Sequence, residues 1–449
     1  MRKVLFLLMT SCLGLTAMAQ TDSLTLQQAV VIALERNPQR KAALAEVRAA
    51  RSFIREAQSG YFPQLSFSET AVRSNDPVFV FGTRLRQTRF TAADFALDRL
   101  NTPAPIGNFA TRFGLQWKVF DSFATSAGVR QAAREKSAFD QRLARAEQTI
   151  VFRVIQAYYG VLFAGRQLEL AEHAASTSQS VLEQSRARFE AGSTVESDYL
   201  AAQVDHASRQ QELIRARNAL ALARAQLNLA MGAAPEHEYQ TSEPSAALDL
   251  KPPALAEAEG RALKERPDLK ESGEQVAAQE AGIQSAKSAF GPRVNVFAAS
   301  ELDNVNVFGN GGNNWTAGAE LQFDIFAGGQ KSARLARARA NLDAAQAMKQ
   351  VAADGIRLDV RRAWYDFDSA RQMVEVSRGA AAQSEEALRI VSNRYQAGMT
   401  TITEMLRAED AARAARTSYW EAVYRCGTSY AALELAMGTL NTQSRVVMP

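Results

Sequence analysis

The sequence predicts a mainly α fold with a membrane β-barrel: a long antiparallel α-helical barrel plus four β-strands per chain, with the barrel completed by trimerisation. Three observations support this prediction. The chain of 449 residues contains a tandem internal repeat, has two long alanine-rich stretches without proline, and has short segments in which apolar and polar residues alternate. The repeat constrains the architecture more firmly than local propensity does.

The repeat is visible in motifs that recur at two fixed shifts. Asn37-Pro38 recurs as Arg266-Pro267, a shift of 229 residues. The motif Arg-Phe-Glu-Ala-Gly at 188–192 recurs as Arg-Tyr-Gln-Ala-Gly at 394–398, a shift of 206 residues. Because the two shifts differ by 23, the first copy has 23 extra residues between these motifs. They are expected in one long loop at about 74–108.

The repeat divides the chain into predicted parts. These are a signal peptide at 1–19, a first repeat at 20–239, a linker at 240–253, a second repeat at 254–440 and a C-terminal tail at 441–449.

The signal peptide is indicated by three features near the start of the chain. Arg2 and Lys3 precede an apolar run, and a cleavage motif Ala-Met-Ala occupies 17–19. This order is typical of a secretory signal, so we expect export and a mature chain that begins at Gln20. The alternative is lipid attachment at Cys12 instead of this cleavage.

Each copy is predicted to begin with one amphipathic helix. Apolar residues recur at helical spacing from Leu26 to Leu34, which predicts a helix over about 25–59, and its counterpart spans about 254–289. Pro63 and Pro292 then end helical geometry.

Much longer helices are predicted further along each copy. The stretches 106–234 and 293–448 contain no proline and are rich in alanine. A helix over 121–189 would be about 100 Å long at ~1.5 Å per residue. Gly192 and Gly398 are followed by hydroxyl residues, and a glycine cap with hydroxyl N-caps ends one helix and begins the next. Each long helix therefore reverses into an antiparallel partner.

Two segments per copy are predicted to be strands. Phe113, Leu115 and Trp117 alternate with polar residues in the first copy, and 315–325 alternates similarly in the second. A period of two places all apolar side chains on one side of a sheet, and strands of about 9 to 12 residues can cross a membrane. Four strands cannot close a barrel, and lipid does not tolerate an open edge, so closure requires further subunits. Because the smallest membrane barrels have about eight strands, at least a dimer is implied, and a trimer would give a wider, water-filled lumen.

The two faces and the ends of the strands have different predicted surroundings. The polar face is expected to line the lumen. Aromatic residues at the strand ends are expected to form a girdle at the periplasmic interface: Tyr61, Phe62, Phe120, Phe290 and Phe326. The alternative is a soluble sheet that packs these aromatic residues in a core.

Composition argues against several functional classes. Lys and Arg number 52 against 48 Asp and Glu, and the basic residues alternate with acidic ones along the helices, so no nucleic-acid-binding face is expected. Three histidines and two cysteines cannot build a zinc cluster of the usual spacing, and neither a metal nor a cofactor is expected. The glycine-rich turn at 309–312 lacks the Lys-Ser/Thr of a phosphate loop. No acid/base pair and no transmembrane helix is expected, and an enzyme is disfavoured.

Taken together, these features resemble the TolC family of outer-membrane efflux proteins. They are the signal peptide, the duplicated unit, the paired Arg-aromatic-x-x-Gly turns and the Ala-Met-Gly motif that ends both copies. The resemblance implies a homotrimer that spans the periplasm and contacts outer-membrane lipid. It also implies a periplasmic adaptor and an inner-membrane transporter as partners, and export of small molecules or proteins. The alternative is a coiled-coil structural protein of the envelope without a channel.

The resemblance places the contact with the adaptor on the two helix-turn-helix tips. The matching residues are Phe189, Ala191, Gly192 and Ser193 in the first copy, and Ala397, Gly398 and Met399 in the second.

The resemblance also places an entrance gate, for which the matching residues are Asp198, Tyr395, Thr400, Glu404 and Arg407. Thr400 stands where the family has an arginine, and Arg407 stands where it has an acid. We expect Arg407 to pair with Glu404 across one helical turn. Glu404 also completes a capping-box pattern that begins at Thr401.

Overall fold

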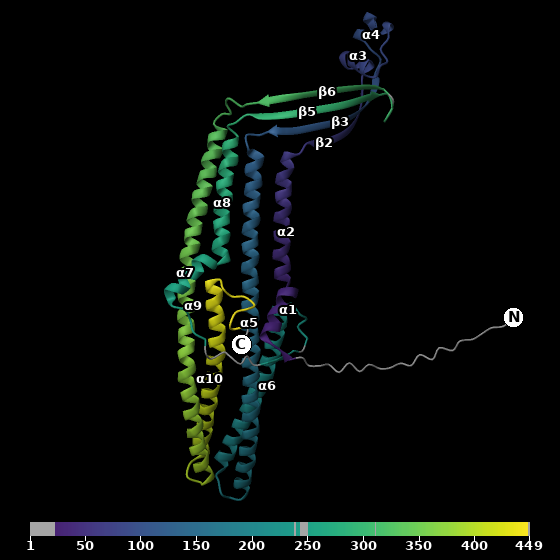
Figure 1. The fold of residues 1–449 in the computed structure, drawn as a ribbon. Helices are drawn as coiled ribbons and strands as arrows, with labels where there is room; N and C mark the ends of the chain where they lie inside the picture. Colours follow the sequence, from purple (N-terminus) through teal and green to yellow (C-terminus); the bar gives the residue numbers. More distant parts are fainter. Residues whose placement is uncertain (1–22, 238, 243–249, 310, 448–449) are drawn as a thin grey trace, which may run out of the picture. The chain divides into compact units, whose positions relative to one another are not determined.

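The computed structural model describes residues 23–237, 239–242, 250–309 and 311–447. The predicted signal peptide, Cys12 and Gln20 lie outside these residues. The chain forms two compact units, each drawn from both halves of the sequence (Figure 1). The described residues within Met1–Pro38, Gln148–Leu255 and Arg361–Pro449 form the helical unit, and those within Gln39–Glu147 and Ala256–Val360 form the sheet unit. The predicted boundaries of the repeats stay a prediction.

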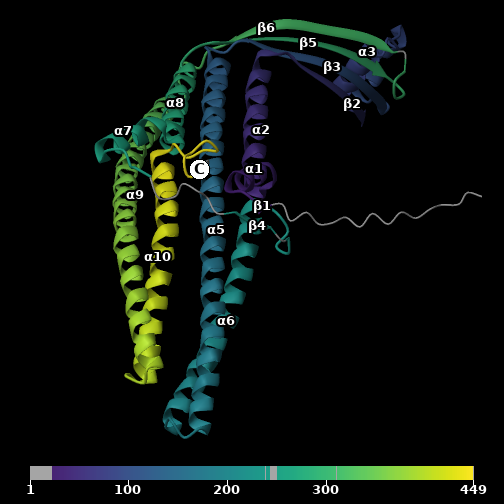
Figure 2. The same ribbon diagram turned by 60° about the horizontal axis from the view of Figure 1, so that its bottom comes forward.

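A four-stranded antiparallel sheet lies in the sheet unit. The strands are β2 (Gln64–Ser74), β3 (Ile106–Phe120), β5 (Arg293–Asn304) and β6 (Gly312–Gln322). They lie side by side in the order β2-β3-β5-β6 (Figure 1, Figure 2). This confirms the four predicted strands. Within the described chain, β2 and β6 each keep one edge without a partner strand.

One face of the sheet is apolar and exposed. Phe67, Phe113, Ser300 and Trp315 pair in register across the four strands and therefore share this face. Phe67 and Phe113 are each 54% exposed and Trp315 is 78% exposed. We call this the apolar face, and its large apolar residues include Leu65, Phe67, Phe113, Leu115, Trp117, Val296, Trp315 and Leu321. Glu69 and Arg73 lie on the same face, toward the end of β2 that leads into α3.

The opposite face is polar. Ser68, Arg112, Glu301 and Asn314 pair in register one residue away from the aromatic row. We call this the polar face, and its polar residues include Gln64, Ser66, Ser68, Arg112, Gln116, Lys118, Glu301, Asn314, Glu320 and Gln322. Val72 and Phe297 are large apolar residues on the same face.

The last predicted strand is shorter than expected. Alternation predicts a strand up to residue 325, but β6 ends at Gln322, which pairs with Arg293. Arg293 is the first residue of β5 and follows Pro292, so no ladder partner remains for the residues beyond Gln322. Asp324 instead forms an ion pair with Arg293 at 2.8 Å.

The five predicted girdle residues are all exposed, Phe120 by 39% and Phe326 by 87%. They do not pack in a core, which argues against a soluble sheet.

The single helix predicted at the start of each copy is wrong, because each is broken in two. In the first copy the pieces are α1 (Leu26–Arg36) and α2 (Pro38–Gln58), and in the second they are α7 (Leu255–Glu265) and α8 (Pro267–Ser288). Asn37 and Arg266 each precede proline and have ψ of 126° and 123°. The proline ring excludes helical geometry from the residue before it.

The long loop predicted at 74–108 contains helices, which corrects the prediction. They are α3 (Pro77–Arg86), the 3₁₀ helix η2 (Ala92–Phe95) and α4 (Leu97–Asn101). Asp76 caps α3 through a 2.7 Å bond from the Phe79 amide, and Pro77 occupies the first helical position.

The long helices and their antiparallel partners are confirmed. They are α5 (Ala124–Glu190), α6 (Glu196–Met231), α9 (Gln330–Gln396) and α10 (Ile402–Met437). The remaining elements are η1 (Ser59–Tyr61) and the short parallel strands β1 (Ser23–Leu24) and β4 (Gln240–Thr241). In the part of the chain that the structure describes, no helix is long and apolar enough to cross a membrane.

The core of the helical unit is built from aromatic residues on α5, α9 and α10. Tyr158 and Phe367 are fully buried, and the ring of Phe367 lies 5.2 Å from that of Tyr430. The C-terminal residues Leu440 and Val447 are also buried, so the tail packs onto this unit.

Glu434, buried at the end of α10, predicts a pH-dependent stability. Burial raises the pKa of Glu434 to about 7, although Ser444 and the charge of Arg445 act in the opposite direction. The folded protein therefore binds this proton more tightly than the unfolded chain, whose glutamate pKa is about 4.3. The resulting stability, up to roughly 3 kcal/mol, is fully present below about pH 4 and is lost as the pH rises through about 7.

The measurement is the melting temperature at about pH 5 and at about pH 8, and we expect a lower melting temperature at the higher pH. In Glu434→Gln this difference should shrink, because the side chain no longer titrates. An unchanged difference in the variant would assign the pH dependence to other groups.

Candidate functional site

The candidate site lies at the tips of the two helical hairpins of the helical unit, α5–α6 and α9–α10 (Figure 2). Gly192 and Gly398 have φ of +69° and +71°, a left-handed conformation that favours glycine. Gly192 donates a 2.9 Å hydrogen bond to the Phe189 carbonyl, and Gly398 donates a 3.0 Å bond to the Tyr395 carbonyl. Both glycines therefore end their helices in the same way, as the sequence predicts.

The seven predicted tip residues are all exposed. Two of them are large and apolar: Met399 is 68% exposed, and the ring of Phe189 is 38% exposed and stacks on Tyr199 at 5.8 Å. Ser193 fixes the first turn through a 2.9 Å bond from its hydroxyl to the Arg188 carbonyl. The tips thus present a defined apolar and small-residue surface.

Tyr395 has a different environment from the other predicted gate residues. It is 9% exposed and packs in one cluster with Ala202, Ile402 and Met405. The guanidinium of Arg188 lies 5.0 Å from its ring centroid. Because Ala202 belongs to α6 and Tyr395 to α9, this cluster joins the two hairpins.

The acidic residues of the predicted gate accept hydrogen bonds from local hydroxyl groups. Thr194 donates a 2.8 Å bond to Asp198, and Thr400 donates to Glu404. Thr401 also accepts from the Glu404 amide at 3.3 Å, as expected for an N-cap.

The predicted ion pair between Glu404 and Arg407 is wrong. The Glu404 carboxylate turns toward Thr400, and Arg407 is exposed without an ion pair among the described residues. The Thr400 hydroxyl, four residues before Glu404, competes for its carboxylate with the Arg407 guanidinium, three residues after it. Sequence spacing alone does not decide which of the two the carboxylate contacts.

An ionic network between α6 and α10 was not among the sites predicted from the sequence. Arg209 on α6 is buried, and its guanidinium lies 2.7 Å from Asp205, 3.2 Å from Glu212 and 2.5 Å from Asp410 on α10. Arg413 on α10 reaches back to Glu212 at 2.9 Å. The network therefore fastens α6 to α10. The sequence does contain a signal for the pairs within each helix, because oppositely charged residues there are spaced by three or four positions.

Burial and charge act against each other in this network. Burial lowers the pKa of Arg209, but Asp205 and Asp410 outweigh it, so the net shift is upward. Burial raises the pKa of nearby Glu409, and Asp205 raises it further. The site therefore stabilises the charged form of Arg209 and disfavours a further negative charge.

No group at the tips is arranged for covalent chemistry. Across the ranges that the structure describes, no cluster of three or more His, Cys, Asp or Glu side chains could hold a metal ion. The tips present exposed residues on two turns. Below them, hydroxyl–carboxylate hydrogen bonds lie within each hairpin, and an ion pair joins α6 to α10.

Comparison with known proteins identifies the family. The family model described as outer membrane efflux protein matches residues 29–233 and 260–439. The chain belongs to this family. It is an outer-membrane efflux channel protein that spans the periplasm, which confirms the resemblance, function and location predicted from the sequence. The family consists of transport channels, not enzymes.

Individual relatives agree with this assignment. The chain is 26% identical to the outer membrane efflux protein BepC of Brucella suis over 86% of this chain and 79% of the relative. It is 25% identical to the alkaline protease secretion protein AprF of Pseudomonas aeruginosa over 91% and 83% of the two chains.

Solved structures share the fold. The outer membrane channel CmeC of Campylobacter jejuni superposes with a TM-score of 0.77 at 17% identity, over 94% of this chain and 87% of that one. The outer membrane protein VceC of Vibrio cholerae superposes with a TM-score of 0.74 at 20% identity, over 92% of this chain and 96% of that one.

Proposed function

We propose that three copies of this chain assemble into one channel and that it works with a periplasmic adaptor and an inner-membrane transporter. The observation that supports the trimer is the four-stranded sheet with free edges on β2 and β6. An exposed edge is not tolerated in lipid, so β6 of one copy pairs with β2 of the next. Four strands from each of three copies then close one barrel.

The two faces of the sheet have different surroundings in this assembly. The apolar face, with Phe67, Phe113 and Trp315 exposed in one row, contacts outer-membrane lipid. The polar face lines a water-filled lumen, because interior and exterior residues alternate along every barrel strand.

The hairpin tips are the docking site for the adaptor. Phe189, Ala191, Gly192 and Ser193 contribute from one hairpin, and Ala397, Gly398 and Met399 from the other. Exposed apolar side chains on a rigid turn are typical of a protein contact. The inner-membrane transporter supplies the energy for export.

The entrance gate lies beside the tips and consists of Asp198, Tyr395, Thr400, Glu404 and Arg407. Packing around Tyr395 and the hydroxyl contacts of Asp198 and Glu404 keep the entrance closed. The exposed Arg407 offsets the charge of Glu404 without pairing with it.

Reconstitution into a planar lipid bilayer tests the channel. The intact trimer should produce discrete ion-conducting steps, and the same preparation dissociated by heat should produce none. An intact trimer that passes no ions would contradict the proposal and would favour a structural coiled-coil protein of the envelope.

A further inference from the structure

We propose that residues 75–105 form a folded cap on the outer end of the polar face and limit the size of the molecules that pass the extracellular mouth. The inference rests on the proposed function, in which the polar face lines the lumen. The segment joins β2 to β3 at the strand ends that lie away from α2 and α8 (Figure 1). It therefore occupies the end of the sheet opposite to α2 and α8.

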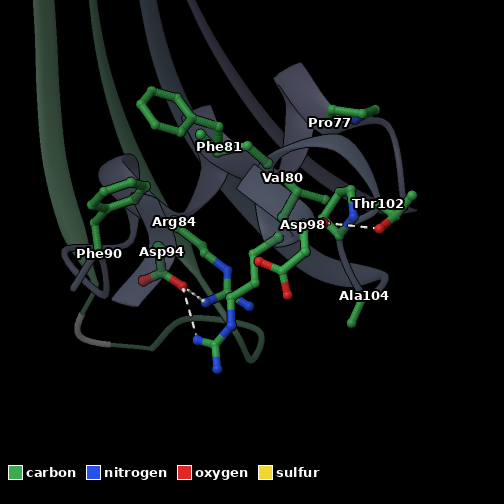
Figure 3. A pocket seen from close by; sticks show the side chains of 12 residues that line it. Pro77, Val80, Phe81, Arg84, Phe90, Asp94, Asp98, Thr102 and Ala104 are labelled. Atoms are coloured by element: carbon green, nitrogen blue, oxygen red, sulfur yellow. Dashed lines mark hydrogen bonds and ion pairs between the residues drawn. The ribbon is translucent and has the colours of Figure 1, made fainter. Parts of the chain in front are cut away.

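The cap has a core of its own. The ring of Phe90 lies 4.8 Å from that of Phe81 and 5.2 Å from that of Phe95, both edge to face. Arg84 contacts the buried Asp94 at 2.5 Å beside a cavity of about 450 Å³ between α3 and α4 (Figure 3). A segment with its own aromatic cluster and an ion pair to a buried carboxylate keeps a defined shape.

Gln87 anchors the cap to the sheet. Its side chain is 2% exposed, and its amide nitrogen lies 2.8 Å from the Asn108 side-chain oxygen. The same nitrogen lies 3.0 Å from the Gly107 carbonyl and 3.1 Å from the Asn304 carbonyl. The two amide protons are shared among three acceptors, and because these acceptors belong to β3 and β5, they hold Gln87 against both strands.

The anchor lies on the polar face. Asn108 donates a 2.5 Å bond to Asp303, a fully buried carboxylate that also accepts from Asn314 at 3.3 Å. Arg86, next to Gln87, donates to Glu301 at 3.1 Å. Glu301 and Asn314 are both polar-face residues. The cap is therefore fastened over the face that lines the lumen and not over the lipid-facing one.

A close backbone contact fastens the cap to the remaining strand. A Cβ added to Gly312, the first residue of β6, would clash with the Arg86 carbonyl oxygen. Only glycine permits this approach. Contacts to β3, β5 and β6 together make the cap a fixed part of the mouth, and in a closed barrel every copy contributes one.

The test measures access to the lumen from outside in intact cells. The full chain carries Gln116→Cys, at an exposed polar-face position nearer the helical end of β3. Burial raises the pKa of the thiol of Cys426, so this cysteine stays unreactive. The reagents, added outside, are a small charged maleimide and a maleimide carried on a large polyethylene glycol.

Two changes release the cap. The first replaces 75–105 with Asn-Gly, a two-residue hairpin turn that joins Ser74 to Ile106, which already pair in register. The second is Gln87→Ala, which keeps the cap but removes its anchor. Gln322→Ala is the matched control, because Gln322 is exposed on the same face and lies far along β6 from the anchor.

With the cap intact, we expect the small reagent to label the thiol introduced by Gln116→Cys and the large one to be excluded. The shortened chain should be labelled by both, and Gln87→Ala should gain labelling by the large reagent while Gln322→Ala does not. Equal labelling by the large reagent in all variants would overturn the cap and leave the channel in place. If the small reagent fails even in the shortened chain, the polar face does not line a water-filled lumen, and the channel arrangement itself fails.

Discussion

Replacing Gly192 or Gly398 with aspartate is expected to abolish export while the trimer still assembles. Both glycines have left-handed φ, which costs a residue with a Cβ roughly 1 to 2 kcal/mol. No atom lies within 4 Å of a Cβ added at either position, so the substitution strains the turn without a clash inside the chain. It also places a charge on the proposed adaptor contact, where burial of an unpaired charge is costly.

The measurement is the accumulation of a fluorescent dye that wild-type cells export, with trimer content checked by gel electrophoresis under mild conditions. Gly192→Asn is the control, because asparagine matches aspartate in size and adopts left-handed φ about as readily but adds no charge, so it isolates the effect of the charge. We expect it to retain most export. If both aspartate variants export normally, the adaptor docks elsewhere.

Replacing Arg209 with methionine is expected to cost about 1 to 3 kcal/mol of stability, because charge-assisted hydrogen bonds are lost while two of the three carboxylates left behind are partly exposed to water. Arg209 is 5% exposed and contacts three carboxylates within 3.2 Å. Without it, Asp205, Glu212 and Asp410 repel one another, and only Arg413 still contacts two of them. The contact between α6 and α10 should loosen first.

Melting temperature in detergent measures this effect. Arg407→Met is the matched control, because Arg407 is exposed and makes no ion pair among the described residues, and it should change the melting temperature little. Adding Asp410→Asn to Arg209→Met should recover part of the loss by removing one unpaired charge. Equal melting temperatures for Arg209→Met and Arg407→Met would mean that the network does not stabilise the hairpins.

The sequence predicts best those elements that local periodicity and turn chemistry determine. The long helices follow from alanine-rich stretches without proline, and the strands follow from strict alternation. The turns at Gly192 and Gly398 follow from a conformation that glycine adopts most easily. The breaks at Asn37 and Arg266 depend on equally local proline chemistry, but apolar spacing continues across them, and periodicity alone predicts one helix.

The ionic network around Arg209 and the anchor at Gln87 were not predicted, because both depend on contacts between residues that are distant in the sequence. Arg209 and Asp410 are 201 residues apart, and Gln87 and Asn304 are 217 apart. Only the fold brings them together. At the proposed gate, whether the Glu404 carboxylate contacts Thr400 or Arg407 depends on side-chain rotamers. The burial of Tyr395 depends on Ala202 in the other hairpin. The turns at the candidate tips could be predicted because glycine chemistry is local, whereas the role of the tip residues as an adaptor contact follows only from the resemblance and stays a prediction.

The most direct test of the trimeric channel is the mass of the intact complex, measured by native mass spectrometry after extraction in mild detergent. Free edges on β2 and β6, together with the exposed apolar face, predict a single species with three copies of the chain. A stable monomer would contradict the account, because its four strands would leave both edges unpaired in lipid. A stable dimer would equally contradict it, because eight strands would close a narrower barrel than the lumen proposed for export.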